Sequence, residues 1–297
     1  MELYTLDLNF QSIPQTIAAY LLVGPEGPVL VETGPGSTLP GLQAELAKHG
    51  YKPADVRHVF VTHIHLDHAG AAGWWAQQGA QIYVHPFGAP HLINPARLLN
   101  SALRIYGDRM DTLWGDFLPA PADKVTEVHD GQIIEAAGLQ FKVIETPGHA
   151  RHHHAYRVGD IAFTGDVAGI RLPSTSFVDV PAPPPEFELT VWQETIDRLL
   201  KEELQTIYPT HFGPITAVYE HFTLLRGLLE ETAVFVKSQM DSGVDRDSLV
   251  KLYNQWNRQR ARESGISETA IHQYETANPW YMSVDGIIRY WRKRETS

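Results

Sequence analysis

The feature that most restricts the fold of this chain is a cluster of metal-binding side chains directly after a short apolar run. The segment Thr62-His63-Ile64-His65-Leu66-Asp67-His68 contains three histidines and one aspartate within six residues. The run before it, residues 56–61, is short and rich in β-branched side chains, which predicts a buried strand. The cluster therefore begins where a strand ends, and loops held by a rigid sheet are the usual place for catalytic and metal-binding groups.

The chemistry of this cluster suits metal ions. Imidazole nitrogens and carboxylate oxygens bind zinc, and imidazole also suits iron and other first-row metals. His63 and His65 are two residues apart, so in an extended chain they point the same way, whereas Asp67 and His68 fall where the chain turns. One loop could thus face two neighbouring cations. A polar loop with clustered histidines is the alternative, but the density of ligand-type residues after a strand favours a metal site.

Three further predicted strands end in a ligand-type side chain. His149 follows the strand predicted at residues 139–146, Asp166 follows residues 161–163, and His211 follows residues 204–208. With the first cluster, seven such side chains stand at four strand ends: His63, His65, Asp67, His68, His149, Asp166 and His211. This is the right number for two metal ions that share one carboxylate.

The composition narrows the class of protein. A chain of 297 residues with 43% hydrophobic content is long enough for a large core and exceeds one typical domain. No apolar run reaches 18 residues, the N-terminus has no signal-peptide pattern, and there is no cysteine for disulfides or thiolate ligands. We therefore expect a cytoplasmic protein that does not associate with membranes. The net charge of −11 weighs against nucleic acid as a partner.

The order of these motifs resembles the metallo-β-lactamase superfamily: His-x-His-x-Asp-His, then Gly-His, then Gly-Asp, then a late histidine, over residues 17–214. The resemblance implies an α+β fold, a four-layer αββα sandwich with the metal centre at one edge between the two sheets. Carried over by position, the first metal would be held by His63, His65 and His149, and the second by Asp67, His68 and His211. Asp166 would bridge them. Two zinc ions are expected, with iron or manganese as alternatives.

The expected mechanism follows from charge. Two dications about 3.5–4 Å apart share one water and lower its pKa to about 7, which gives a metal-bridging hydroxide that attacks a carbonyl or phosphorus. Asp67 could steer this nucleophile or hand a proton to the leaving group. Asp67 and the bridging Asp166 are thus the predicted catalytic residues.

Three other residues are expected to support the ligands or to line the pocket. Glu32 stands where many relatives of this fold carry aspartate in an Asp-Thr-Gly turn, and its longer carboxylate could still hydrogen-bond a ligand histidine. His85 ends a predicted strand and could line the pocket. His153 follows His149 closely, and a supporting or surface role is favoured over that of a further ligand.

The predicted function is hydrolysis of a small ester, thioester or lactone as the small-molecule substrate. Thioesters come first by resemblance to hydroxyacylglutathione hydrolases, and lactones next by resemblance to acylhomoserine lactonases. The late histidine lies in Thr-His-Phe-Gly, which departs from the Gly-His-Glu context of the former. The alternatives are a mononuclear iron persulfide dioxygenase, with iron on His65, His149 and Asp166 or a similar subset, a phosphodiesterase, or a non-catalytic metal-binding protein.

The chain is predicted to divide at residue 214. Residues 1–214 would form the sandwich, and residues 215–297, where apolar residues step by three and four, would form helices packed on it. A cover over the metal site or a homodimer surface is the alternative role for these helices. An insertion at residues 86–122 carries helical patches and aromatic residues, which indicate either packing on the sheet or a wall of the pocket.

Overall fold

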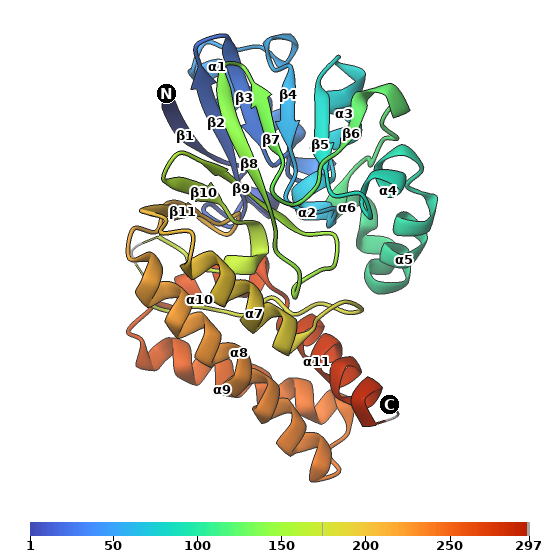
Figure 1. The fold of residues 1–297 in the computed structure, drawn as a ribbon. Coiled ribbons are helices and arrows are strands. Elements are labelled where there is room, and N and C mark those ends of the chain that lie inside the picture. Colours follow the sequence, from blue (N-terminus) through green and yellow to red (C-terminus); the bar gives the residue numbers. More distant parts are fainter. Residues whose placement is uncertain (174, 296–297) are drawn as a thin grey trace.

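The computed structural model of this chain describes residues 1–173 and 175–295, so residue 174 and the last two residues of the predicted C-terminal region lie outside it. Two sheets stand together in the upper part of Figure 1. The first sheet consists, in spatial order, of β1 (Glu2–Asp7), β2 (Ala18–Gly24), β3 (Gly27–Val31), β4 (His58–Phe60), β5 (Gln81–Val84) and β6 (Val125–Glu127). It is antiparallel from β1 to β3 and parallel from β3 to β6.

The second sheet has five strands, and only the pair at one edge of the sheet is parallel. In spatial order it consists of β11 (Thr206–Tyr208), β10 (Ile161–Phe163), β9 (His154–Val158), β8 (Leu139–Glu145) and β7 (Ile133–Ala136). β10 and β11 pair in parallel, and the other pairs are antiparallel.

Helices surround the sheets and extend below them. The helices of the first 214 residues are α1 (Leu39–Lys48), α2 (Leu66–Ala69), α3 (Ala72–Gln77), α4 (Ala89–Ile93), α5 (Ala96–Tyr106), α6 (Met110–Trp114) and α7 (Leu189–Leu200). The C-terminal helices are α8 (Val218–Asp241), α9 (Arg246–Glu263), α10 (Glu268–Ala277) and α11 (Trp280–Glu295). In the described ranges, no helix combines the length and the apolar character needed to cross a bilayer.

The first sheet is an inner layer, because its alternate residues enter two different cores. On β2, Tyr20 and Leu22 belong to a hydrophobic cluster shared with the second sheet, whereas Leu21 belongs to a cluster on the outer face. Successive side chains of a strand point to opposite faces, so both faces of this strand are covered. The outer cluster includes Leu42 of α1 and Trp75 of α3.

The second sheet is covered in the same way by α7. Trp192, Ile196 and Leu199 of this helix are buried in a cluster with Ile144 of β8. Ile144 lies on the opposite face of the strand from Phe141, whose ring stacks on Phe60 of the first sheet. The layers are therefore helix, sheet, sheet and helix, and the expected αββα sandwich of α+β class is confirmed.

The C-terminal helices begin with side-chain caps where the sequence offers them. The carboxylate of Asp245 accepts hydrogen bonds from two backbone N–H groups at the start of α9, and the hydroxyl of Ser267 accepts one from Ala270 at the start of α10. Buried residues of α8 and α11, such as Phe222 and Val284, belong to the cluster that runs between the sheets. The predicted helical region is confirmed, and the division at residue 214 stays a prediction.

Candidate metal centre

The first ligand-type residues lie where β4 leaves the sheet. His65 has extended backbone angles and precedes α2, which carries Asp67 and His68 in its short span. His63 and His68 are fully buried, and Asp67 is partly exposed. The chain therefore turns between the two pairs, as the spacing of the motif predicts.

Two glycines allow the second sheet to present its side chains. Gly148, before His149, has a φ of +127°, and a Cβ there would lie 2.4 Å from the Cα of Trp192. Gly165, before Asp166, has a φ of +51°, and a Cβ there would lie 2.4 Å from the hydroxyl oxygen of Thr62. No other residue type fits so close to neighbouring atoms with a positive φ.

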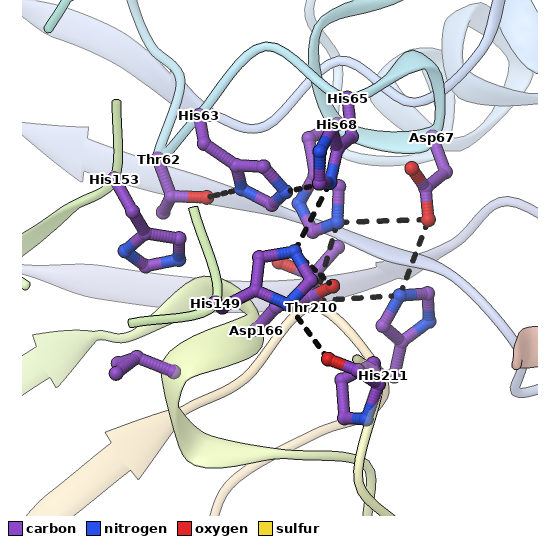
Figure 2. Close-up of polar contacts among 12 residues, drawn as sticks. Thr62, His63, His65, Asp67, His68, His149, His153, Asp166, Thr210 and His211 are labelled. Carbon is purple, nitrogen blue, oxygen red and sulfur yellow. Dashed lines mark hydrogen bonds and ion pairs between the residues drawn. The ribbon is translucent and has the colours of Figure 1, made fainter. Parts of the chain in front are cut away.

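The seven predicted side chains come together in two adjoining groups, as Figure 2 shows. The first group is His63, His65, His149 and Asp166, and the second is Asp67, His68 and His211. Within each group, the candidate ligand atoms all lie within 4.8 Å of one another. Both groups could therefore hold a metal ion.

Asp166 lies between the two groups. Its Oδ2 is 3.3 Å from Nε2 of His149 in the first group, and its Oδ1 is 3.2 Å from Nε2 of His68 and 3.5 Å from Nε2 of His211 in the second. Asp67 faces the second group only, with Oδ2 3.3 Å from Nε2 of His211. One carboxylate thus reaches both groups, which is the geometry of a bridging ligand.

The outer nitrogens of four histidines have partners that fix their protons. Nδ1 of His149 lies 2.8 Å from the carbonyl of Pro181, and Nδ1 of His211 lies 2.7 Å from the carbonyl of Thr16. A carbonyl can only accept, so each Nδ1 carries the hydrogen, and each ring in its neutral form presents the Nε2 lone pair to the centre. Nδ1 of His68 donates in the same way to the carboxylate of Glu32, at 3.1 Å.

His63 follows the same rule through one intermediate group. The hydroxyl of Thr62 donates to Glu32 at 2.5 Å, so its oxygen is free to accept from Nδ1 of His63 at 3.1 Å. The inner nitrogens then meet: Nδ1 of His65 lies 2.9 Å from Nε2 of His63 and 3.0 Å from Nε2 of His149. Imidazole nitrogens and carboxylate oxygens that converge in this way can bind a cation, so the donor set fits the metals that the resemblance implies.

Two further observations agree with this fit. Among the described residues, the buried atoms Nε2 of His68 and Oδ1 of Asp166 have no hydrogen-bond partner. Burial lowers the pKa of His149 to about 4, despite the opposing effect of Asp166, so the ring is neutral at pH 7. Burial opposes the ionisation of Asp67, but His68 and His211 outweigh it and lower its pKa to about 2. His149 and Asp67 are thus in the protonation states that metals need. Burial opposes protonation of His68 and His211, but the carboxylates of Asp166 and Asp67 outweigh it and raise the pKa of both rings, so a metal bound at the second group would displace protons from them.

Glu32 ties two ligand-bearing loops together, residues 62–68 and residues 210–211. It is buried, has a φ of +66°, and its Oε1 accepts from the hydroxyls of Thr62 and Thr210 as well as from His68. Its Oε2 lies 3.3 Å from the backbone nitrogen of Thr62. Sequence reasoning missed both threonines, although each directly precedes a ligand-type histidine, and this repeated Thr-His pair was the available signal.

The other two expected supporting residues lie close to the centre but outside both groups. Nδ1 of His153 is 2.7 Å from the hydroxyl oxygen of Thr146, and its ring centroid is 4.8 Å from that of His63. His85 lies 3.5 Å from Glu145 and packs on the ring of His154, and it is not among the described residues that line the cavity.

A cavity of about 580 Å³ opens over the centre. Its lining includes the ligand loops, N-terminal residues such as Phe10, the insertion at residues 86–122, the proline-rich loop at residues 181–186, and helices α10 and α11. Tyr106 joins the insertion to α11, because its hydroxyl lies 3.4 Å from the sulfur of Met282. The insertion and the C-terminal helices α10 and α11 therefore both form walls of the pocket.

This fold and this arrangement of ligand-type residues define a class of metal-binding α+β proteins. The chain belongs to the metallo-beta-lactamase superfamily, whose family model matches residues 13–211.

Individual relatives are distant. The metallo-beta-lactamase fold-containing protein ST1585 of Sulfurisphaera tokodaii is 26% identical over 218 residues, which cover 72% of this chain and 79% of that protein. The structure of the metallo-beta-lactamase family protein TTHA1429 of Thermus thermophilus covers 99% of this chain and 94% of its own, with a TM-score of 0.68 and 22% identity. A hydroxyacylglutathione hydrolase of Shewanella pealeana is 30% identical over 109 residues, 36% of this chain and 31% of that enzyme.

Proposed function

We propose that this chain is a dinuclear metal-dependent hydrolase of small esters, thioesters or lactones. The observation that carries the proposal is the position of Asp166, whose two oxygens face different groups of ligand-type residues. Two zinc ions fit a donor set of imidazoles and carboxylates without cysteine. His63, His65 and His149 would hold the first ion, Asp67, His68 and His211 the second, and Asp166 both.

In such a hydrolase the histidines and Asp67 would have different roles. Bound divalent metals would supply hydroxide at neutral pH and polarise the carbonyl of the substrate. The outward hydrogen bonds of the histidines keep their lone pairs directed at the centre. Asp67 is the more exposed of the two aspartates, 19% against 5% for the side chain, and it lines the cavity. Its ionised carboxylate can orient a water molecule by accepting a hydrogen bond and can carry a proton to the leaving group.

Thioesters are the first class of substrate to test. The similarity to a hydroxyacylglutathione hydrolase supports this choice over part of the chain. The volume of the cavity is that of sites for small molecules, which supports a small acyl compound over a polymer.

Elemental analysis of the purified protein tests the proposal, and we expect close to two zinc ions per chain. Asp166→Asn should lower occupancy of both sites, whereas His211→Gln should chiefly remove one ion. His272→Gln, at an exposed histidine, is the matched control and should keep both. One iron per chain would favour the dioxygenase, and no metal before or after reconstitution would refute the assignment. Hydrolysis of thioesters, lactones or phosphodiesters by the zinc protein then identifies the bond that is cleaved.

A further inference from the structure

Arginine side chains line the cavity, and two of them have no charged partner among the described residues. Three arginines reach it: Arg97 on α5, Arg109 just after that helix, and Arg151 beside the ligand loop. Arg151 is occupied, because its Nε lies 3.0 Å from Glu186. Arg97 and Arg109 are exposed, and neither forms a hydrogen bond or an ion pair with any residue of the described ranges.

The carboxylates of the cavity, by contrast, are all engaged. Glu275 lies 2.6 Å from Arg258, and Glu186 pairs with Arg151. Asp67 and Asp166 belong to the metal centre. The charge that remains unbalanced in the cavity is therefore positive, and it lies on the insertion.

One side chain of the cavity, Tyr106, is influenced both by a candidate ligand and by one of the unpaired arginines. Burial raises the pKa of Tyr106, and both the carboxylate of Asp67 and the guanidinium of Arg109 act on its hydroxyl, in opposite directions. Tyr106, Asp67 and Arg109 all line the cavity, and Tyr106 is within electrostatic range of the other two. One ligand in this cavity could meet both.

The walls that accompany these charges are largely apolar. Leu98, Ala102 and Trp114 of the insertion and Met282 of α11 line the same cavity. An apolar segment of a ligand would be buried there, while an anionic end would find the arginines. The chain as a whole carries a net charge of −11 and repels anions at a distance, so an anionic ligand needs local cations of this kind.

We infer that the substrate is an anionic acyl compound, with a carboxylate or phosphate separated from the reacting carbonyl by an apolar segment and bound by Arg97 and Arg109. The identity of the reacting carbonyl rests on the proposed function. The recognition of the anion does not, because it uses residues outside the metal centre.

Matched substrates test the inference on the zinc-loaded protein. Hexanoyl thioesters of 3-mercaptopropionate, of 2-mercaptoethyl phosphate and of propanethiol place a carboxylate, a phosphate or no charge on the thiol side. The 4-nitrophenyl monoester of adipic acid and 4-nitrophenyl heptanoate place a carboxylate or no charge on the acyl side. We expect kcat/KM for an anionic member to exceed that of its neutral counterpart by about tenfold or more. The preferred member shows which anion is bound and on which side.

Variants assign this preference to residues. In the double variant Arg97→Gln, Arg109→Gln, the ratio of anionic to neutral kcat/KM should fall to near one, with unchanged metal content. Arg104→Gln is the matched control, since Arg104 is an exposed arginine of the same helix that is not among the cavity-lining residues, and it should keep the ratio. A neutral substrate that is preferred, or a ratio that survives the double variant, would overturn the inference.

Binding of uncleaved amides separates this inference from the proposed hydrolysis. Calorimetric titration with N-hexanoyl-β-alanine and with N-propylhexanamide measures recognition alone. If no ester or thioester is cleaved but the anionic amide binds in an arginine-dependent way, the inference stands and the proposed hydrolysis fails. If neutral esters are cleaved and neither arginine affects anion preference or binding, the hydrolysis stands and the inference fails.

Discussion

Substitution of Glu32 by alanine or by glutamine tests whether this residue stabilises the protein by accepting hydrogen bonds from the loops that carry the candidate ligands. Four donors point at this buried carboxylate: two threonine hydroxyls, one backbone N–H group and Nδ1 of His68. Glu32→Ala leaves all four without an acceptor, and each buried unsatisfied donor costs about 1–3 kcal/mol. Because neighbouring losses are not additive, we expect the free energy of unfolding to fall by about 4 kcal/mol or more.

Glu32→Gln should be far milder. Three of the four donors converge on Oε1, which the amide oxygen can replace, and only the backbone nitrogen of Thr62 then faces an NH₂ group. One unsatisfied contact corresponds to about 1–2 kcal/mol. Because His68 and, through Thr62, His63 are oriented by this residue, metal affinity should fall by about 10- to 100-fold in the alanine variant.

Urea unfolding of protein with a known metal content measures the change in stability, and competition with a chelator measures the change in metal affinity. Glu26→Gln is the control, because Glu26 is an exposed residue of the turn between β2 and β3, and it should change stability by less than about 0.5 kcal/mol. Equal stability of the alanine and glutamine variants would show that the acceptor geometry does not matter. An alanine variant as stable as the wild type would refute the reasoning altogether.

Two other buried groups give equally direct tests. The two oxygens of Asp179 accept hydrogen bonds from three side-chain N–H donors, and an asparagine can offer only one oxygen, so Asp179→Asn should lower the free energy of unfolding in urea by about 2–4 kcal/mol. The control Asp285→Asn removes an ion pair near the surface and should cost less than about 1 kcal/mol. Equal losses in the two variants would contradict this account. Burial lowers the pKa of His221 to about 4, so the unfolded state binds more protons below pH 6.5, and stability falls as the pH drops toward 4. Between pH 7 and 5 this group accounts for about 2 kcal/mol, which His221→Gln should remove from the pH dependence of unfolding, whereas the exposed control His272→Gln should not.

The positions of the candidate ligands were predictable because they depend on local patterns. Short β-branched runs predict strands, and a histidine or aspartate directly after a strand lies at the edge of the sheet. This reasoning puts His149, Asp166 and His211 at strand ends, and the resemblance predicts that they share one centre with the first cluster. The four layers followed from resemblance rather than from periodicity, since alternation alone does not say which sheet faces which.

The groups that orient the ligands were less predictable. Two of the acceptors are backbone carbonyls, those of Thr16 and Pro181, and a carbonyl has no signature in the sequence. Glu32 was expected to be able to reach a ligand histidine, but its contacts with Thr62 and Thr210 depend on loops 30 and 178 residues away along the chain. The cavity charges depend in the same way on which arginines find partners, and that is decided by tertiary packing.

The C-terminal helices contribute to the site in a way that a boundary at residue 214 obscures. Asn257 of α9, Asn278 and Trp280 donate to the buried carboxylate of Asp179. Two residues further along the same segment, the carbonyl of Pro181 accepts from Nδ1 of His149. That contact fixes which nitrogen of His149 faces the centre, so the helices, by holding the segment that carries this carbonyl, help to orient a candidate ligand. Residues of α10 and α11, among them Met282, line the cavity, so the C-terminal region shapes both the geometry of the candidate ligands and the pocket.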